Sequence, residues 1–181
     1  AIRPNAALIV FPLADDYSFG VLQSLIHWAW FEAKCSTLAG QYRYTSDTVF
    51  DTFPWPQAPT PEQVRGVAAA AVALRELRRE VMQRQGWSLR DLYRTLDTPG
   101  KNPLRDAQER LDVAVRAAYG MPAGADILGF LLTLNGQLAA AEARGEMIVG
   151  PGLPAGFNPA DFTTADAVRP LVGGTATGGG A

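Results

Sequence analysis

The sequence predicts an α+β fold that is mainly α-helical, in which a small α/β segment precedes a helical, bundle-like domain. Beyond residue 60 the apolar residues recur at the three- and four-residue spacing of helices, whereas strand-like runs occur only before residue 45. A proline-rich stretch at 54–61 separates the two regions. We therefore predict units at 1–58 and 59–150, the second able to fold alone, and a Gly/Pro-rich tail at 151–181.

Composition limits the function classes. The chain has 181 residues, is 48% hydrophobic and 19% charged, and has a net charge of −2, so contact with nucleic acid would need a local basic patch. Its single cysteine, Cys35, cannot form an internal disulfide or hold a metal alone. No signal peptide or bilayer-length apolar run is present. These features predict a reducing, cytoplasmic setting with no membrane partner. Because the chain opens without methionine, we expect a piece of a longer protein.

The first unit begins with an apolar run at 6–13, which predicts a buried strand. Residues 19–38 predict one helix that is apolar on most sides, so we expect upstream chain to pack against it. Gly40 ends this helix, and 41–44 predicts a short strand. His27 lies within the helix without a second histidine or a carboxylate cluster, which favours a hydrogen-bonded structural histidine over a metal ligand.

The stretch at 42–56 combines two aromatics around a cation with a proline-terminated apolar run. Tyr42, Arg43 and Tyr44 suit contact with nucleic-acid bases and backbone. The alternative is that the stretch forms core plus linker. Four large apolar side chains within it require burial: Val49, Phe50, Phe53 and Trp55.

Capping signals mark the helices of the second unit. Thr60-Pro61-Glu62-Gln63 predicts a capped start, and Gly86 predicts the end of that helix. Ser88, Asn102 and 126–144 predict three further helices. Five arginines lie off the apolar stripe of the first helix of this unit: Arg65, Arg75, Arg78, Arg79 and Arg84. They form either a solvated helix face or a face that contacts DNA phosphates.

Several segments, in order, carry a resemblance to a known family: 7–13, 24–30, 42–56, 92–96, 99–104, 111–115 and 118–120. Together they resemble the C-terminal part of MmeI-like (type IIL/IIG) adenine-specific DNA methyltransferases, from about residue 7 to 154. The resemblance implies the end of a target-recognition domain followed by a helical C-terminal domain. It also implies two partners, double-stranded DNA and an upstream methyltransferase domain of the same polypeptide.

The catalytic parts of that family are missing from this sequence. Its glycine-rich cofactor loop is absent, and neither Asn102-Pro103 nor Asn158-Pro159 continues into an Asn-Pro-Pro-Tyr motif. We therefore expect an inactive fragment without catalytic residues, metal ligands or a cofactor. S-adenosylmethionine, and any endonuclease activity, would belong to the parent enzyme.

The resemblance also implies base-reading positions. Two residues flanking a single position before the Tyr-x-Tyr read one base pair in that family, and here they are Ala39 and Gln41. A glutamine amide matches adenine in the major groove, and Ala39 could pack on the thymine methyl, so we favour an A·T pair. The alternative for Gln41 is that it satisfies backbone groups at a helix end. The predicted DNA-binding residues are thus Ala39, Gln41, Tyr42, Arg43 and Tyr44.

Two function classes remain open. The leading one is a DNA-recognition fragment of an adenine methyltransferase in a restriction–modification system. The other is a non-enzymatic helical protein-interaction module, which needs no aromatic-cation chemistry. A small-molecule enzyme is disfavoured, since no acid–base pair is evident.

Overall fold

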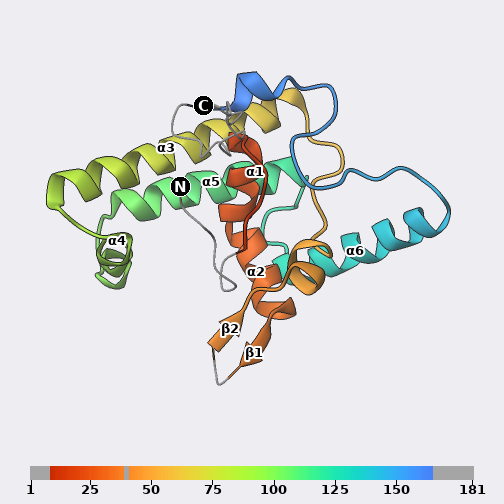
Figure 1. The fold of residues 1–181 in the computed structure, drawn as a ribbon, viewed down its shortest axis with the longest axis horizontal. Helices are drawn as coiled ribbons and strands as arrows, with labels where there is room; N and C mark the ends of the chain where they lie inside the picture. Colours follow the sequence, from red (N-terminus) through yellow and green to blue (C-terminus); the bar gives the residue numbers. More distant parts are fainter. Residues whose placement is uncertain (1–8, 39–40, 165–181) are drawn as a thin grey trace, which may run out of the picture.

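The computed structural model describes residues 9–38 and 41–164 and is mainly helical (Figure 1). Its main helices are α1 (Asp16–Gln23), α2 (Leu25–Lys34), α3 (Pro61–Gln85), α4 (Leu89–Arg94), α5 (Pro103–Ala118) and α6 (Ile127–Ala143). Two short strands, β1 (Ser36–Leu38) and β2 (Gln41–Arg43), form an antiparallel pair. Three short turns complete the elements: η1 (Ser46–Phe50), η2 (Thr95–Asp97) and η3 (Pro159–Phe162). The predicted fold class is therefore confirmed.

The long helices α3 and α5 lie side by side, and α1 packs across α3 (Figure 1). Gly20 makes this crossing close, because a Cβ atom there would lie 2.7 Å from the Cγ1 atom of Val67. The apolar core is continuous from Tyr17 of α1 to Leu74 of α3 and Leu111 of α5, all fully buried. Packing thus crosses the proposed boundary at 58/59, and the division into separately folding units stays a prediction.

The predicted helix ends of the second unit are confirmed. The Thr60 hydroxyl accepts from the backbone N–H of Gln63, whose side chain accepts from Thr60 N–H, so the capping box is complete. Gly86 ends α3 at φ +67°, a left-handed conformation that favours glycine. Ser88 and Asn102 cap α4 and α5 as predicted.

The single helix predicted over 19–38 and ended by Gly40 is wrong, because the helix is interrupted at Ser24 and α2 ends at Lys34, before β1. At the interruption ψ is 160°, the Ser24 hydroxyl donates to Val21 O at 2.7 Å, and the same oxygen accepts from His27 N–H. A long-range contact supports the break: the carboxylate of Asp112 on α5 accepts from Leu25 N–H at 2.8 Å. This contact comes from far along the chain, so local periodicity could not reveal it.

One further expectation for the first unit needs correction. Residues 9–13 form no strand, and Ile9 and Val10 are 39% and 64% exposed; Pro12 lacks the N–H that a ladder needs. Residues 6–8 of that prediction lie outside the described part. Helix α3 covers α1, whereas Leu25 and Trp28 of α2 stay about half exposed, so the packing of upstream chain against this region stays a prediction.

The segment after β2 is locked into the core, as its apolar side chains predicted. Val49, Phe53 and Trp55 are almost completely buried, and Phe50 is half-buried. Its backbone carbonyls accept from distant side chains: Val49 O from Trp30 Nε1, Thr52 O from Asn135 Nδ2 and Pro54 O from the Tyr119 hydroxyl. Helices α2, α5 and α6 thus hold the segment that follows the hairpin.

Candidate nucleic-acid interface

The hairpin of β1 and β2 extends beyond the end of α2 and away from the α3–α5 pair (Figure 1). Its register pairs Ser36 with Arg43, Thr37 with Tyr42 and Leu38 with Gln41. Side chains alternate between the two faces of a strand, so Tyr42 and Arg43 lie on opposite faces. The hairpin is therefore a short, narrow projection with an aromatic face and a cationic face.

The five predicted DNA-binding residues all fall in or beside this hairpin, with unequal exposure. Tyr42 is 57% exposed and Arg43 is exposed. Gln41 opens β2 and pairs with Leu38 through the backbone, while its side chain and the whole of Ala39 lie outside the described residues. Tyr42 and Arg43 are thus the members of the set that the structure offers to solvent.

Tyr44 differs from Tyr42, because its ring is packed against other aromatic rings. It stacks on Phe31 of α2, with centroids 5.5 Å apart and planes 16° apart, and meets Phe11 edge-on at 5.7 Å. Burial, with a smaller contribution from the charge of Asp51, raises the pKa of Tyr44 to about 12. The Tyr44 hydroxyl is therefore protonated at neutral pH, and its ring serves first to join the hairpin to α2.

His27 lies beneath Tyr44 and hydrogen-bonds it, with 3.0 Å between Nε2 and the hydroxyl. The imidazole is buried and meets the Phe53 ring edge-on at 4.9 Å. Burial lowers its pKa to about 4, against a smaller upward effect from a hydrogen bond to the Leu22 backbone. The interpretation of His27 as a hydrogen-bonded histidine rather than a metal ligand agrees with these contacts.

Trp28 is an exposed aromatic residue on the helical segment that the sequence predicted to be apolar on most sides. Its ring is 48% exposed and lies 5.2 Å from the ring of Phe31, which in turn meets Tyr42 at 5.7 Å. Trp28, Phe31 and Tyr42 form a continuous row from α2 to the hairpin, here called the aromatic ledge. The three-residue spacing of Trp28 and Phe31 was the signal that could have placed both rings on one face.

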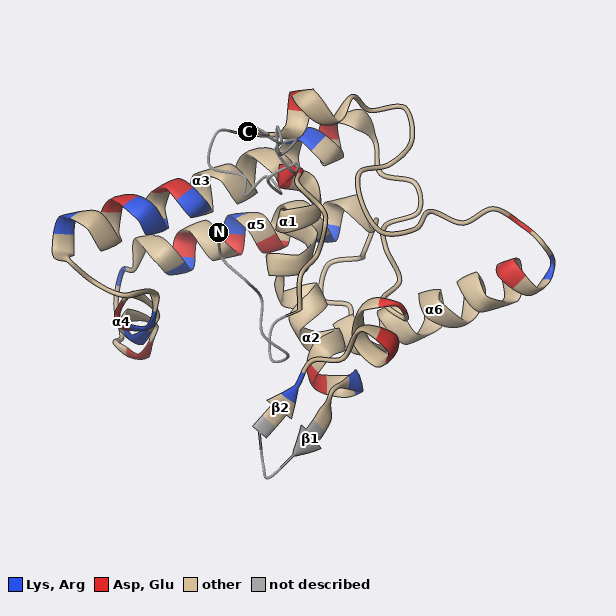
Figure 2. Cartoon of the chain, in the orientation of Figure 1, with Lys and Arg blue, Asp and Glu red and all other residues tan. Residues whose placement is uncertain are grey.

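The positive charge near the hairpin is small and local. Arg43 ends β2, and Lys34 ends α2 with its Nζ 4.9 Å from the centroid of the Trp30 ring. Figure 2 shows basic residues at these two element ends, whereas acidic and basic residues alternate along α3. The described surface around the hairpin thus offers two cations rather than a broad basic field.

Most of the α3 arginines contact other groups of the protein. Arg75 pairs with the buried carboxylate of Asp16 at 2.5 Å, and Arg78 hydrogen-bonds Gln23 at 3.2 Å and the Tyr93 hydroxyl. Arg65 and Arg79 pair with glutamates one helical turn away on α3. The phosphate-contacting interpretation of this set is therefore poorly supported for its partly buried members. Arg84 remains exposed in the last turn of α3.

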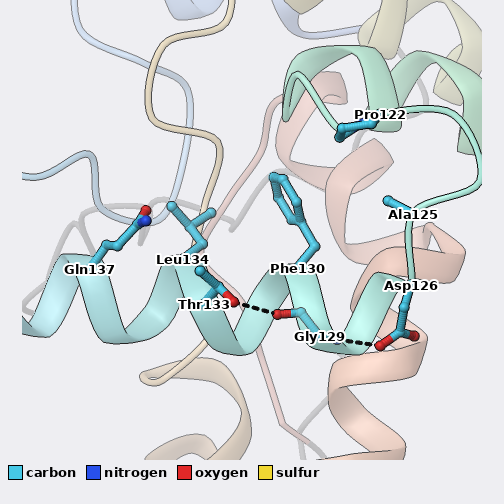
Figure 3. A pocket seen from close by; sticks show the side chains of 8 residues that line it. All are labelled: Pro122, Ala125, Asp126, Gly129, Phe130, Thr133, Leu134 and Gln137. Atoms are coloured by element: carbon cyan, nitrogen blue, oxygen red, sulfur yellow. Dashed lines mark hydrogen bonds between the residues drawn. The ribbon is translucent and has the colours of Figure 1, made fainter.

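A concave feature lies along α6, a groove of about 440 Å³ (Figure 3). Phe130 and Leu134 supply its apolar wall. Its polar groups serve the helix itself, since the Asp126 carboxylate caps Gly129 N–H at 2.8 Å and the Thr133 hydroxyl donates to Gly129 O. The groove therefore offers an apolar surface without an acid–base pair.

No cluster of three histidine, cysteine, aspartate or glutamate side chains suited to a metal ion occurs in residues 9–38 and 41–164. Within the same ranges, every helix is too short or too polar to cross a bilayer.

Comparison with known proteins gives three concordant matches. Residues 2–57 match the family model described as MmeI, target recognition domain. DNA methyltransferase A of Bacillus subtilis (strain 168) is 33% identical over 118 residues, which are 65% of this chain and 12% of that protein. A solved structure of the type IIL restriction–modification enzyme MmeI in complex with DNA is 28% identical, with a TM-score of 0.57, over 70% of this chain and 17% of that one. The chain therefore spans a small part of the length of both proteins.

Proposed function

We propose, from the membership of residues 2–57 in the MmeI target-recognition domain family, that this chain recognises a DNA sequence for a larger adenine methyltransferase. The observation that carries the proposal is the projecting hairpin within the matched segment, with Tyr42 and Arg43 exposed on its opposite faces. A two-stranded ribbon is narrow enough to enter the major groove, where each base pair presents a distinct pattern of donors and acceptors.

In this proposal the hairpin residues divide into positioning and reading roles. Arg43 contacts a phosphate, which holds the hairpin on any duplex. Gln41 reads one base pair through its amide, with adenine as the favoured base, and Ala39 packs on the thymine methyl of that pair. Tyr42 continues the aromatic ledge toward the DNA and packs against sugar or base.

Chemistry on the DNA would be performed elsewhere in the polypeptide. The partners of the chain are then double-stranded DNA and an upstream methyltransferase domain that binds S-adenosylmethionine. The chain itself neither binds this cofactor nor transfers methyl groups. Calorimetry with S-adenosylmethionine and the 181-residue chain tests this, and saturable binding would contradict it.

The test of DNA recognition uses the 181-residue chain and a pool of randomised duplexes. Bound DNA is sequenced to obtain base preferences, and affinity is measured by fluorescence anisotropy over a range of salt. Because few cations lie near the hairpin, we expect weak binding, and because that binding depends on phosphate contacts, we expect it to be lost as salt rises. Tight binding that persists at high salt, or a bound pool without any base preference, would refute the proposal.

Three variants separate the roles. Gln41→Ala should cost about 1–3 kcal/mol of discrimination at one position and leave the others unchanged. Arg43→Ala should weaken binding to all sequences alike. Arg84→Ala, a matched removal of an exposed arginine at the far end of α3, should do neither. Equal losses in Arg43→Ala and Arg84→Ala would indicate diffuse charge rather than a hairpin interface.

The exposed face of α6 favours the second candidate, a helical protein-interaction module. Leu132 of α6 is 45% exposed, and the groove lined by Phe130 and Leu134 on the same helix is apolar. The same anisotropy experiment separates the two candidates, because an interaction module should show no binding to DNA even at low salt.

A further inference from the structure

The hairpin has little internal support. Its ladder comprises three residue pairs, and a two-stranded hairpin of that length is at best marginally stable alone. Ring contacts from Tyr42 and from Tyr44, which follows β2 directly, join it to Phe31 of α2. The orientation of the hairpin on the rest of the protein therefore depends on the residues that fix these rings.

Tyr44 is the more strongly fixed of the two. A stacked ring can slide over its neighbour at small cost, whereas a hydrogen bond is directional and has a preferred length. The 3.0 Å bond between the Tyr44 hydroxyl and His27 Nε2 supplies that direction. It joins the residue after β2 to the first turn of α2, 17 positions earlier in the chain.

His27 is in turn held in place by its surroundings. Only 7% of it is exposed, and its ring meets the buried Phe53 ring edge-on. His27 also hydrogen-bonds the backbone of Leu22, and this bond favours the charged form of the imidazole. A bond with that effect is one in which the ring donates to a carbonyl oxygen, so the ring nitrogen that faces Leu22 carries a proton. In the neutral ring this leaves Nε2 as acceptor, and the Tyr44 hydroxyl donates to it.

We propose that His27 and Tyr44 form a positioning pair for base reading, in which one buried hydrogen bond sets the orientation of the hairpin on α2. This inference rests on the proposed function, since it concerns the accuracy with which Gln41 meets its base. A recognition group misplaced by a fraction of an ångström loses a directional hydrogen bond. Loss of the pair therefore relaxes sequence selectivity while leaving contacts to phosphate in place.

The test compares three single variants and one double variant of the 181-residue chain. Tyr44→Phe removes the hydroxyl and keeps the ring stack, whereas His27→Gln replaces the other partner. Tyr17→Phe is the matched control, because the buried Tyr17 hydroxyl has no hydrogen-bond partner within the described residues. A Tyr44→Phe/His27→Gln double variant should lose no more hairpin order than either single variant, since the same bond is broken in each.

Two readouts are needed, and the first involves no DNA. Amide hydrogen exchange followed by NMR should rise about fivefold for the hairpin amides in Tyr44→Phe, as expected for one lost hydrogen bond, while α3 amides keep their protection. Unchanged hairpin exchange would overturn the pair. A parallel rise throughout α3 would also overturn it, because the bond would then support the whole fold rather than the hairpin.

The second readout is selectivity on the randomised duplex pool. In Tyr44→Phe the preference at the position read by the hairpin should fall about fivefold, with the salt dependence of binding unchanged; Tyr17→Phe should match the wild type. Faster hairpin exchange with full selectivity would refute the positioning role. A wild-type chain without any base preference would instead refute the proposed function, and with it the reading role. The exchange data keep the two failures apart. Faster hairpin exchange in Tyr44→Phe shows that the pair holds the hairpin, even if the wild-type chain has no base preference.

Discussion

Acid should destabilise this protein through His27. The imidazole is buried and neutral in the fold, with a pKa lowered from 6.5 to about 4. In the unfolded chain it regains its ordinary pKa and binds a proton below about 6.5. The unfolded state therefore binds more protons between these values, so the free energy of unfolding decreases as pH falls from 6.5 toward 4.

The size of the effect follows from the two pKa values. At pH 5 the unfolded histidine is almost fully protonated and the folded one mostly neutral, which corresponds to about 2 kcal/mol relative to pH 7. Tyr44, the titratable group that hydrogen-bonds the ring, has a pKa of about 12 and stays protonated throughout this range. The predicted loss is a large fraction of the stability of an ordinary domain.

Urea unfolding at pH 7, 6 and 5 measures this loss, with His27→Gln as reference. Carboxylates titrate in both proteins, so their contribution cancels in the comparison. Any cost of the substitution at pH 7 cancels as well, because only the change with pH is compared. The wild type should lose about 2 kcal/mol more than the variant between pH 7 and pH 5. Equal losses would refute the assignment of a buried, neutral imidazole.

Two further predictions concern the contacts that position α1 and α2, and urea unfolding checks both. Gly20→Ala should lower the free energy of unfolding by about 1–3 kcal/mol, because the new Cβ would lie 2.7 Å from the branched side chain of Val67. Gly66→Ala, at a position on α3 with no atom near the new Cβ, should instead raise it by up to about 1 kcal/mol. A less stable Gly66→Ala than Gly20→Ala would contradict the close crossing of α1 and α3. Asp112→Ala should lower the free energy of unfolding by about 1 kcal/mol, because it removes the side chain that caps Leu25 N–H. Asp112→Asn keeps an acceptor oxygen and should be tolerated. Equal losses of stability in the two variants would show that the carboxylate acts by its charge.

The sequence predicted the helix ends correctly where the interactions that determine them involve residues a few positions apart. The start of α3 at Thr60 depends on Gln63, and its end depends on Gly86 alone. The cap of α5 likewise involves only neighbouring residues, because the Asn102 side chain accepts from the backbone N–H groups of Leu104 and Arg105. The family resemblance was also confirmed, because it rests on motifs spread along the chain rather than on one short pattern.

The errors arose where distant residues decide the structure. Nothing between 19 and 38 shows that Asp112 of α5 will cap a new helix start after Ser24. The apolar run that ends at Leu13 had the composition of a strand but has no ladder partner among the described residues. Apolar content predicts burial only where another element is present to cover it.

The site shows the same limit for its aromatic residues. Tyr42 and Tyr44 are identical in type and two positions apart, so both were predicted equally to contact DNA. In the fold, Phe31 and His27 hold Tyr44, whereas Tyr42 reaches solvent at the end of the aromatic ledge. Their roles in DNA contact stay predictions, but their environments already differ.

The contacts around α2 link hairpin orientation to the helical region. Asp112 of α5 fixes the first turn of α2, and His27 in that turn holds Tyr44 at the end of β2. Because Leu25 and His27 lie two positions apart in the first turn of α2, a shift of α5 would be passed to the hairpin through two hydrogen bonds. The helical region would then contribute to selectivity without touching DNA.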